Sequence, residues 1–335
     1  MVVDDNFFMA LAVNEAWKYQ GLTYPNPAVG CCVVKDGAIL GVNAHQRAGE
    51  PHAEVLALRD SYLKLTNDTN IKKLSSSQDI HNYLLQNHNG CFHGCLVYTT
   101  LEPCSHMGKT PSCASLISAL GVKKVFVGFR DINKEASDGN SILKSSNIDV
   151  VEGTLQKECE DLIAPFNKWQ KKNFVFFKWA QRLDGSIDGG TISSKTSRTN
   201  VHAMRDVCDL LVIGGNTVRL DRPILDARLV DGKAPDVLII SQQKEFDKTI
   251  PLFHVEGREV FIQSDFSKLS EYKNIMIEGG LQMFELSKDV VDYYLCYVAF
   301  KMGGGHTFGK SVQNFELLNI QKETQDIIMW MKRKI

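Results

Sequence analysis

The stretch LEPCSHMGKTPSC, residues 101–113, contains two cysteines, Cys104 and Cys113, with eight residues between them. Cys113 opens a segment with helical periodicity, and upstream the run His52-Ala53-Glu54 opens another. One histidine and two cysteines are a zinc ligand set that leaves a fourth position for water, which is the composition of a catalytic site rather than a closed structural one. The spacing therefore predicts a catalytic zinc site formed by His52, Cys104 and Cys113.

Glu54 stands two residues after the predicted histidine ligand, where its carboxylate can reach water at the metal without ligating the metal. A carboxylate there can take a proton from the water and pass it to a leaving amino group. A His-x-Glu pattern followed by Pro-Cys and a second cysteine is the signature of zinc deaminases. The alternative is a helix-capping histidine with two core thiols; the position of both cysteines before a helix favours the deaminase.

Helices and strands alternate on both sides of this stretch, as in an α/β layer. Apolar spacing predicts helices at residues 7–19, 52–63 and 113–120, and β-type runs predict strands at residues 28–34, 38–43, 96–100, 124–129 and 148–151. Lys35-Asp36-Gly37 predicts a hairpin turn between the first two strands. The polar stretch 66–89 interrupts this pattern, so residues 64–94 are expected to be a surface insertion with at most one short helix near residues 80–85.

A chain of 335 residues is long enough for two domains. We expect the first domain at residues 1–150, a connecting amphipathic helix at 151–172 and a second α/β domain at 173–335. Short apolar runs predict strands of that second domain at residues 174–180, 210–213, 237–240, 259–262, 274–277 and 291–299.

Charge and cysteine content narrow the class of protein. Lys+Arg 38 against Asp+Glu 39 gives a net charge of -1, without the basic surplus of a protein that binds nucleic acid through many phosphate contacts. No apolar run approaches the roughly 18 residues of a membrane span, and nine cysteines are an odd number at low density. We therefore expect a cytoplasmic protein with reduced thiols, no membrane contact and no nucleic-acid partner.

Two segments of the second half suggest a phosphate-bearing ligand. LVIGGNTVRLDRP, residues 211–223, and IEGGLQM, residues 277–283, each carry a predicted strand into a glycine-containing turn and then a helix start. Small residues let backbone N–H groups approach a phosphate, and a helix N-terminus favours the anion. A plain turn would explain either Gly-Gly pair alone.

These segments together resemble the bifunctional deaminase/reductase family of riboflavin biosynthesis. TYPNPAVG at 23–30, the 101–113 stretch, FKWAQRLDGSI at 177–187 and the two glycine-containing segments occur in the family's order and cover nearly the whole chain outside the insertion. The resemblance implies a cytidine-deaminase-like three-layer α/β/α domain followed by a dihydrofolate-reductase-like α/β domain. It also implies zinc, NADPH, a pyrimidine ribotide substrate and a homo-oligomer, a dimer or larger, that associates through the reductase domain.

The resemblance assigns roles residue by residue. His52, Cys104 and Cys113 would bind zinc, with Glu54 as the proton shuttle. The substrate would contact Asn26, His45, Lys109, Thr110, Ser194, Arg205, Leu225, Arg228 and Glu278. NADPH would contact Ala180, Thr196, Thr217, Asp221, Gly280, Leu281, Gln282 and Met283.

The chain departs from the family pattern at some positions and leaves two other functions open. Arg182 replaces a small residue, Lys109 replaces a common arginine, and the segment 189–200 is shorter than usual. The first alternative is a nucleoside or nucleic-acid deaminase whose C-terminal half is a binding module; those deaminases have only two residues between their cysteines. The second is a regulatory protein stabilised by zinc. Cys91-Phe92-His93-Gly94-Cys95 offers a further three potential ligands, too few in five residues to favour a second metal site.

Overall fold

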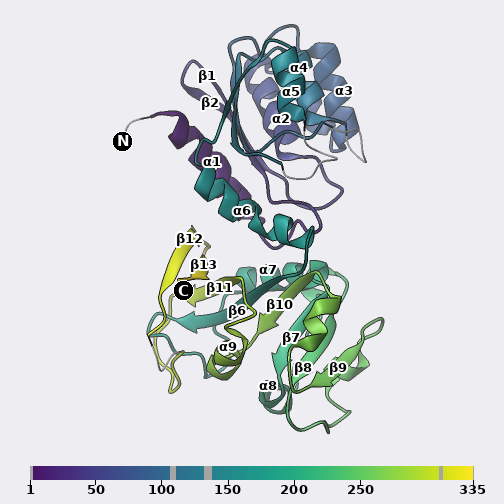
Figure 1. The fold of residues 1–335 in the computed structure, drawn as a ribbon, viewed down its shortest axis with the longest axis vertical. Helices are drawn as coiled ribbons and strands as arrows, with labels where there is room; N and C mark the ends of the chain where they lie inside the picture. Colours follow the sequence, from purple (N-terminus) through teal and green to yellow (C-terminus); the bar gives the residue numbers. More distant parts are fainter. Residues whose placement is uncertain (1–2, 106–110, 132–137, 309–311, 335) are drawn as a thin grey trace. The chain divides into compact units, whose positions relative to one another are not determined.

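The computed structural model describes residues 3–105, 111–131, 138–308 and 312–334. The chain divides into two compact units, Met1–Asn167 and Lys168–Ile335 (Figure 1). Among the described residues, no helix is both long and apolar enough to span a membrane.

The first unit is built on a five-stranded mixed sheet. Its strands, in spatial order, are β2 (Ala38–Ala44), β1 (Gly30–Lys35), β3 (Leu96–Leu101), β4 (Lys124–Phe129) and β5 (Asp149–Glu152). Strand β1 is antiparallel to β2 and β3, whereas β3, β4 and β5 are parallel. Asp36 and Gly37 take positive φ angles of 49° and 78°, so the predicted hairpin turn is confirmed.

Helices cover both faces of this sheet, which confirms the three-layer α/β/α domain. Their bounds are α1 (Asp5–Trp17), α2 (Ala53–Thr66), α3 (Ser77–Asn87), α4 (Cys113–Leu120), α5 (Gly139–Ser145) and α6 (Gln156–Trp169). A Cβ on Gly30 of β1 would lie 1.9 Å from the Ala12 carbonyl oxygen of α1, and one on Gly128 of β4 would lie 2.2 Å from Cys159 Sγ of α6. On the opposite face, a Cβ on Gly41 of β2 would meet the α2 backbone at 2.3 Å. Glycine therefore lets the helices of both outer layers approach the sheet closely.

The segment 64–94, expected to be a surface insertion with at most one short helix near residues 80–85, contains more regular structure than that. The segment forms a 3-10 helix at Thr69–Lys73 and the three-turn helix α3. Ile71, Ile80 and Leu84 are fully buried, and Asp68 accepts hydrogen bonds from the Tyr83 and Tyr62 hydroxyls. A few widely spaced apolar residues therefore fold this polar stretch against the rest of the unit.

The segment between the units differs in detail from the sequence-based expectation. A boundary at 150 falls inside β5, because residues 149–152 pair with β4. The helix after it, α6, begins at Gln156 and packs on the first sheet, where the Gln20 amide donates a 2.8 Å hydrogen bond to the Leu162 carbonyl. Most of α6 therefore belongs to the first unit.

The second unit contains an eight-stranded sheet. Its strands, in spatial order, are β12 (Phe315–Lys322), β13 (Asp326–Arg333), β11 (Tyr293–Ala299), β6 (Phe174–Arg182), β10 (Asn274–Glu278), β7 (Leu210–Gly214), β8 (Asp236–Ile240) and β9 (Val260–Gln263). The strands from β11 to β9 are parallel, and β13 and β12 add an antiparallel edge. The six predicted strands are present, but the sequence analysis missed β12 and β13.

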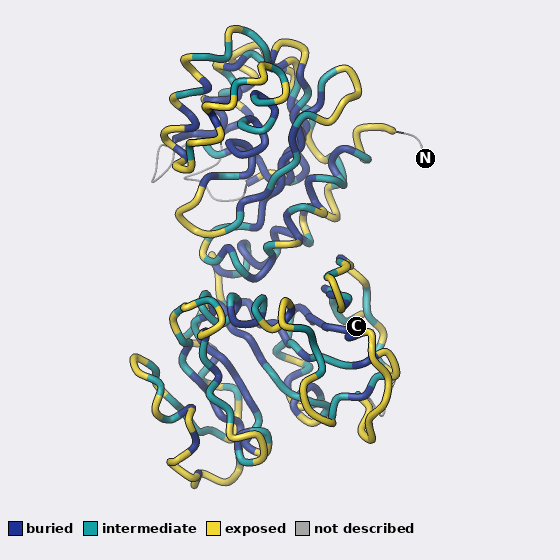
Figure 2. Tube along the Cα trace, turned by 180° about the vertical axis from the view of Figure 1, so that it is seen from behind, coloured by how far each residue is buried: buried dark blue, intermediate teal, exposed yellow. Residues whose placement is uncertain are grey.

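Helices α7 (Lys195–Val207), α8 (Gly215–Asp221) and α9 (Leu281–Ser287) accompany this sheet, with short 3-10 helices at Arg228–Val230, Pro251–His254 and Ser267–Glu271. The central strands are the most deeply buried part of the unit (Figure 2). Strand β10 lies between β6 and β7, so the carboxyl ends of β10 and β7 meet at one edge, where α9 and α8 begin. In open parallel sheets this edge is where ligands bind.

Candidate active sites

The structure brings together the three predicted zinc ligands. His52 is the N-cap of α2, Cys113 is the first residue of α4, and Cys104 follows β3. The His52 Nδ1 atom lies 3.4 Å from Cys113 Sγ and 3.7 Å from Cys104 Sγ, and the three ligand atoms lie within 4.8 Å of one another. Tetrahedral zinc with bonds of about 2.0–2.3 Å needs donors roughly 3.5 Å apart, so this donor set fits the ion.

Glu54 lies beside these ligands in the first turn of α2 and is 4% exposed. Burial raises the pKa of its carboxyl to about 7, because the lowering by His52 does not offset the loss of solvent. A carboxyl that titrates near neutral pH can both accept and release a proton during turnover. This is the property that a proton shuttle needs.

Asn26 and His45, two predicted substrate contacts, lie next to the same cluster. The Asn26 Nδ2 atom is 3.0 Å from His45 Nε2, and His45 Nδ1 is 3.1 Å from the Pro51 carbonyl oxygen. The carbonyl can only accept, so Nδ1 carries the proton and Nε2 accepts from the amide. Burial lowers the pKa of His45 to about 4, which keeps the ring neutral at pH 7. The His45 and His52 rings are 5.4 Å apart, which places this pair beside the ligands.

The sequence analysis missed the part that Glu102 plays in this site. Its buried carboxylate accepts hydrogen bonds from the backbone N–H of Asn140 at 2.9 Å and of Asp131 at 3.3 Å. A Cβ on Gly139 would lie 1.8 Å from the Pro103 carbonyl oxygen, so the start of α5 sits directly against the backbone that precedes Cys104. An acidic residue directly before Pro-Cys is all that the sequence shows of this role, because both partners of Glu102 lie about 30–40 residues further along the chain. Lys109 and Thr110, the predicted phosphate contacts, lie outside the described residues.

A second polar cluster surrounds the carboxyl end of β10. Arg205 of α7 donates from Nε and Nη2 to the two carboxylate oxygens of Glu278, at 2.8 and 3.0 Å. Lys178 of β6 lies 3.5 Å from the same carboxylate, and all three side chains are 11–15% exposed. Burial raises the pKa of Glu278, but the charges of Arg205 and Lys178 outweigh it and lower the pKa to about 2. The carboxylate is therefore ionised, and the cluster keeps a net positive charge.

Asp226 connects this cluster to Arg228. The Asp226 carbonyl oxygen accepts from Arg205 Nη1 at 3.3 Å, and its carboxylate accepts from Arg228 Nη1 at 2.5 Å. The preceding residue, Leu225, is buried with φ 60°. Four of the predicted substrate contacts, Arg205, Leu225, Arg228 and Glu278, thus belong to one network. The sequence analysis gave no role to Lys178 or Asp226, although Lys178 lies in the FKWAQRLDGSI segment, residues 177–187.

Ser194, a fifth predicted contact in this unit, has a capping role in the structure. Its side chain accepts from Ser197 N–H as the N-cap of α7, and its own N–H donates to Asp326 at 2.8 Å. Arg182, which departs from the family pattern, is 7% exposed and donates to the Asp188 and Gly189 carbonyls. Through these hydrogen bonds, the larger side chain stabilises the loop that follows β6.

Most of the predicted cofactor contacts lie where strands β7 and β10 end. Thr217 and Asp221 belong to α8, and Gly280 is the N-cap of α9, whose first turn contains Leu281, Gln282 and Met283. A Cβ on Gly214, at the end of β7, would lie 3.3 Å from Met283 Cε, so the two helix starts are neighbours. Small residues and helix N-termini at this edge suit a dinucleotide phosphate.

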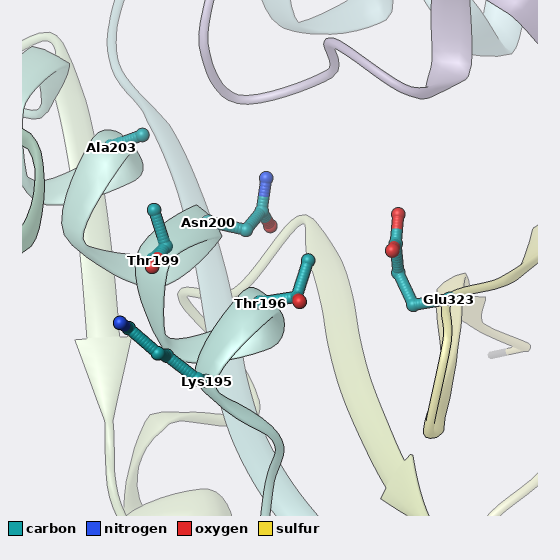
Figure 3. Close-up of a pocket in the computed structure, with 6 residues that line it drawn as sticks. All are labelled: Lys195, Thr196, Thr199, Asn200, Ala203 and Glu323. Atoms are coloured by element: carbon teal, nitrogen blue, oxygen red, sulfur yellow. The ribbon is translucent and has the colours of Figure 1, made fainter.

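Thr196 and Ala180, the other two predicted cofactor contacts, lie on α7 and β6 and not at the ends of β7 and β10. Ala180 is on β6, two residues beyond Lys178 and on the same face of the sheet. Thr196 lines a pocket of about 480 Å³ between α7 and the turn after β12, whose lining includes no other predicted cofactor contact. In Figure 3, Glu323 faces Thr196 and Asn200 across this pocket. The pocket is lined by Lys195, Thr196, Thr199, Asn200, Ala203 and Glu323.

The cysteines outside the zinc cluster form no second metal site within the part of the chain that the structure describes, because only His52, Cys104 and Cys113 gather closely enough. All nine cysteines are free thiols. Cys91 and Cys95 lie around a turn, where the Cys91 carbonyl accepts from Lys35.

Comparisons with known proteins agree with this division into two sites. Residues 2–129 match the cytidine and deoxycytidylate deaminase zinc-binding region, and residues 173–329 match the RibD C-terminal domain. Fold and site together thus define a zinc-dependent deaminase joined to a reductase. The riboflavin biosynthesis protein RibD of Aquifex aeolicus is 30% identical over 98% of both chains, and that of Bacillus amyloliquefaciens is 33% identical over 85% of this chain and 72% of its own.

A solved structure extends the similarity to the whole chain. It is the diaminohydroxyphosphoribosylaminopyrimidine deaminase/5-amino-6-(5-phosphoribosylamino)uracil reductase of Thermotoga maritima, which is 27% identical with a TM-score of 0.62 over 98% of each chain. The chain belongs to the RibD family. It is a bifunctional deaminase and reductase of riboflavin biosynthesis that uses zinc and NADPH and acts on a small molecule.

Proposed function

We propose that the first site deaminates 2,5-diamino-6-(ribosylamino)-4(3H)-pyrimidinone 5'-phosphate and that the second reduces the deaminated product to 5-amino-6-(ribitylamino)uracil 5'-phosphate. The observation that carries the proposal is the buried Glu54 carboxyl beside the converging His52, Cys104 and Cys113 side chains. The reductase activity named for the Thermotoga maritima protein and the second polar cluster at the end of β10 support the second reaction.

In the first reaction, water replaces the ring amino group, and one ammonia leaves for each water consumed. Zinc held by His52, Cys104 and Cys113 would supply Lewis acidity that activates the water. Glu54 accepts the proton of that water and transfers it to the departing nitrogen, so the carboxyl returns to its initial protonation state. Asn26, oriented by the neutral His45 ring, holds the pyrimidine edge.

In the second reaction, the ribosylamine opens to an imine, C1' accepts a hydride and the imine nitrogen accepts a proton from solvent, which gives the ribitylamine. NADPH would supply that hydride. The helix starts near Thr217, Asp221 and Gly280–Met283, with Ala180 and Thr196, would hold the cofactor. Arg205 and Arg228 provide positive charge for the substrate phosphate, with Leu225, Glu278 and Ser194 beside it. Arg205 is oriented by its two bonds to Glu278, so it meets the phosphate as a fixed charge.

The proposal extends to assembly and compartment. We assign Lys109 and Thr110 to the ribotide phosphate at the first site, and no nucleic acid to either site. Self-association through the second unit is supported by the edge strand β12, which exposes Leu317 and Ile320 by 52% and 54%. Nine cysteines without a disulfide and a reaction that consumes NADPH support a reducing, cytoplasmic setting.

The experiment follows ammonia release and NADPH absorbance in the same cuvette after addition of the diaminopyrimidine ribotide. The zinc content per chain is measured on the same protein. Ammonia release followed by NADPH loss, with about one zinc per chain, is expected. Ammonia without NADPH loss would refute the reductase half. NADPH loss only with the deaminated ribotide would refute the deaminase half.

A further inference from the structure

Arg258, just before β9, is bound entirely to backbone carbonyls of a neighbouring loop. Its Nε donates to the Pro235 carbonyl at 2.7 Å, Nη1 donates to the Ile224 carbonyl at 2.8 Å, and Nη2 donates to the Leu225 carbonyl. Among the described residues it forms no ion pair with a carboxylate. Burial lowers its pKa to about 10, so it is still charged at pH 7. A planar guanidinium is the side chain that can hold three carbonyls in a fixed arrangement.

Two of these carbonyls, those of Ile224 and Leu225, belong to a loop with an unusual backbone. Leu225 has φ 60°, a left-handed conformation that costs free energy for a residue with a branched side chain and persists only where the surroundings impose it. In a trans peptide the N–H points away from the preceding carbonyl. Because Arg258 holds the carbonyls of Ile224 and Leu225, the N–H groups of Leu225 and Asp226 are directed away from Arg258.

Those two N–H groups have no acceptor in the part of the chain that the structure describes. Consecutive backbone N–H groups of this kind bind anions. The same loop holds two cations, since the Asp226 carbonyl accepts from Arg205 and its carboxylate accepts from Arg228. One short segment thus combines two unsatisfied donors with two guanidinium groups.

We propose that Arg258 is a positioning residue for the reductase substrate. It fixes the peptides on either side of Leu225 so that their N–H groups, with Arg205 and Arg228, receive the 5'-phosphate of the ribotide. Arg258 itself touches neither substrate nor cofactor. This inference rests on the proposed function, because it takes the second site as the one that binds the ribotide.

The test compares two substrates, the deaminated ribotide and its dephosphorylated riboside, in wild-type protein and in Arg258→Gln and Arg258→Lys. We expect KM for the ribotide to rise about tenfold or more in Arg258→Gln with kcat changed much less, and KM for the riboside to stay unchanged. Arg258→Lys keeps the positive charge but loses the planar guanidinium, so its KM for the ribotide should lie between those of the wild type and Arg258→Gln. Arg333→Gln, which removes an arginine paired with Asp289 in the same unit, is the matched control.

Hydrogen exchange of peptides from β10 and β7 shows whether the second unit of each variant is folded, and Arg258→Lys serves as the test variant if Arg258→Gln does not fold. An equal loss on ribotide and riboside would reduce Arg258 to a purely structural role and overturn the proposal. Unchanged kinetics would overturn it as well. Failure of the proposed function is distinguishable, because the wild-type protein would then oxidise no NADPH with the ribotide.

Discussion

Replacing Glu278 with glutamine should destabilise the second unit by about 3 kcal/mol at neutral pH. The carboxylate is 12% exposed, bonded twice to Arg205 and close to Lys178. Its pKa is lowered from the usual 4.5 to about 2, and at 1.36 kcal/mol per pKa unit this corresponds to about 3 kcal/mol. Removing one partner of a buried ion pair costs roughly 3–5 kcal/mol in other proteins, which is the same magnitude.

The sign of the pH dependence follows from the lowered pKa. Because the carboxyl is more acidic in the folded chain than in the unfolded chain, its stabilisation is complete above the unfolded-state pKa of 4.5. It is lost as the pH falls from 4.5 towards 2. The difference in stability between wild type and Glu278→Gln should therefore be largest at pH 7 and should shrink steadily below pH 4.5.

The assay is urea unfolding of the full chain, read by hydrogen exchange of peptides from β10 and β7, which report the second unit alone. Glu256→Gln, an exposed glutamate in the same unit, is the matched control and should change the free energy of unfolding very little. A destabilisation by Glu278→Gln below about 1 kcal/mol at pH 7, or one that is as large at pH 3 as at pH 7, would refute the reasoning.

Three other predictions concern the first unit. Glu54→Gln should lower ammonia release by about 10²–10⁴-fold while NADPH oxidation with pre-deaminated substrate continues, and parallel loss of both would show that the sites are not independent. Cys113→Ser should lower the zinc content below one per chain and the unfolding temperature of the first unit, measured by atomic emission and calorimetry; full zinc retention would remove this cysteine from the ligand set. Gly30→Ala should destabilise the first unit by about 2 kcal/mol or more, because its Cβ would lie 1.9 Å from a backbone oxygen of α1, and urea unfolding with a normal midpoint would contradict that packing.

Local patterns singled out the three side chains that converge at the first site, because two of them lie at helix starts. Cys113 opens a helix with the predicted bounds, and His52 is the N-cap of an earlier predicted helix. The bond between Arg205 and Glu278 was out of reach, since it depends on how α7 packs beside β10, 73 residues away in sequence. Glu102 was missed for the same reason, because both of its partners follow a different strand.

The two missed strands and the greater length of helix α3 have a different cause. Strand β12 exposes Leu317 and Ile320 at the sheet edge, so its apolar residues do not alternate with polar ones as in a half-buried strand. In α3 only Ile80 and Leu84 are fully buried apolar residues, and the polar residues around them are typical of a loop. In both β12 and α3, tertiary packing determines the secondary structure, because the local sequence pattern is weak.

The order of strands in the second sheet also governs when this unit can fold during synthesis. Strand β6 pairs with β10 and β11, which both follow it in the chain. Phe174 of β6 pairs with Asn274 of β10, which is synthesised 100 residues later. At roughly 5–20 residues per second, translation leaves β6 without its partners for about 5–20 s. During that interval the run Phe174-Val175-Phe176-Phe177, fully covered in the finished sheet, is exposed on the nascent chain, so ribosome-associated chaperones have a defined segment to shield.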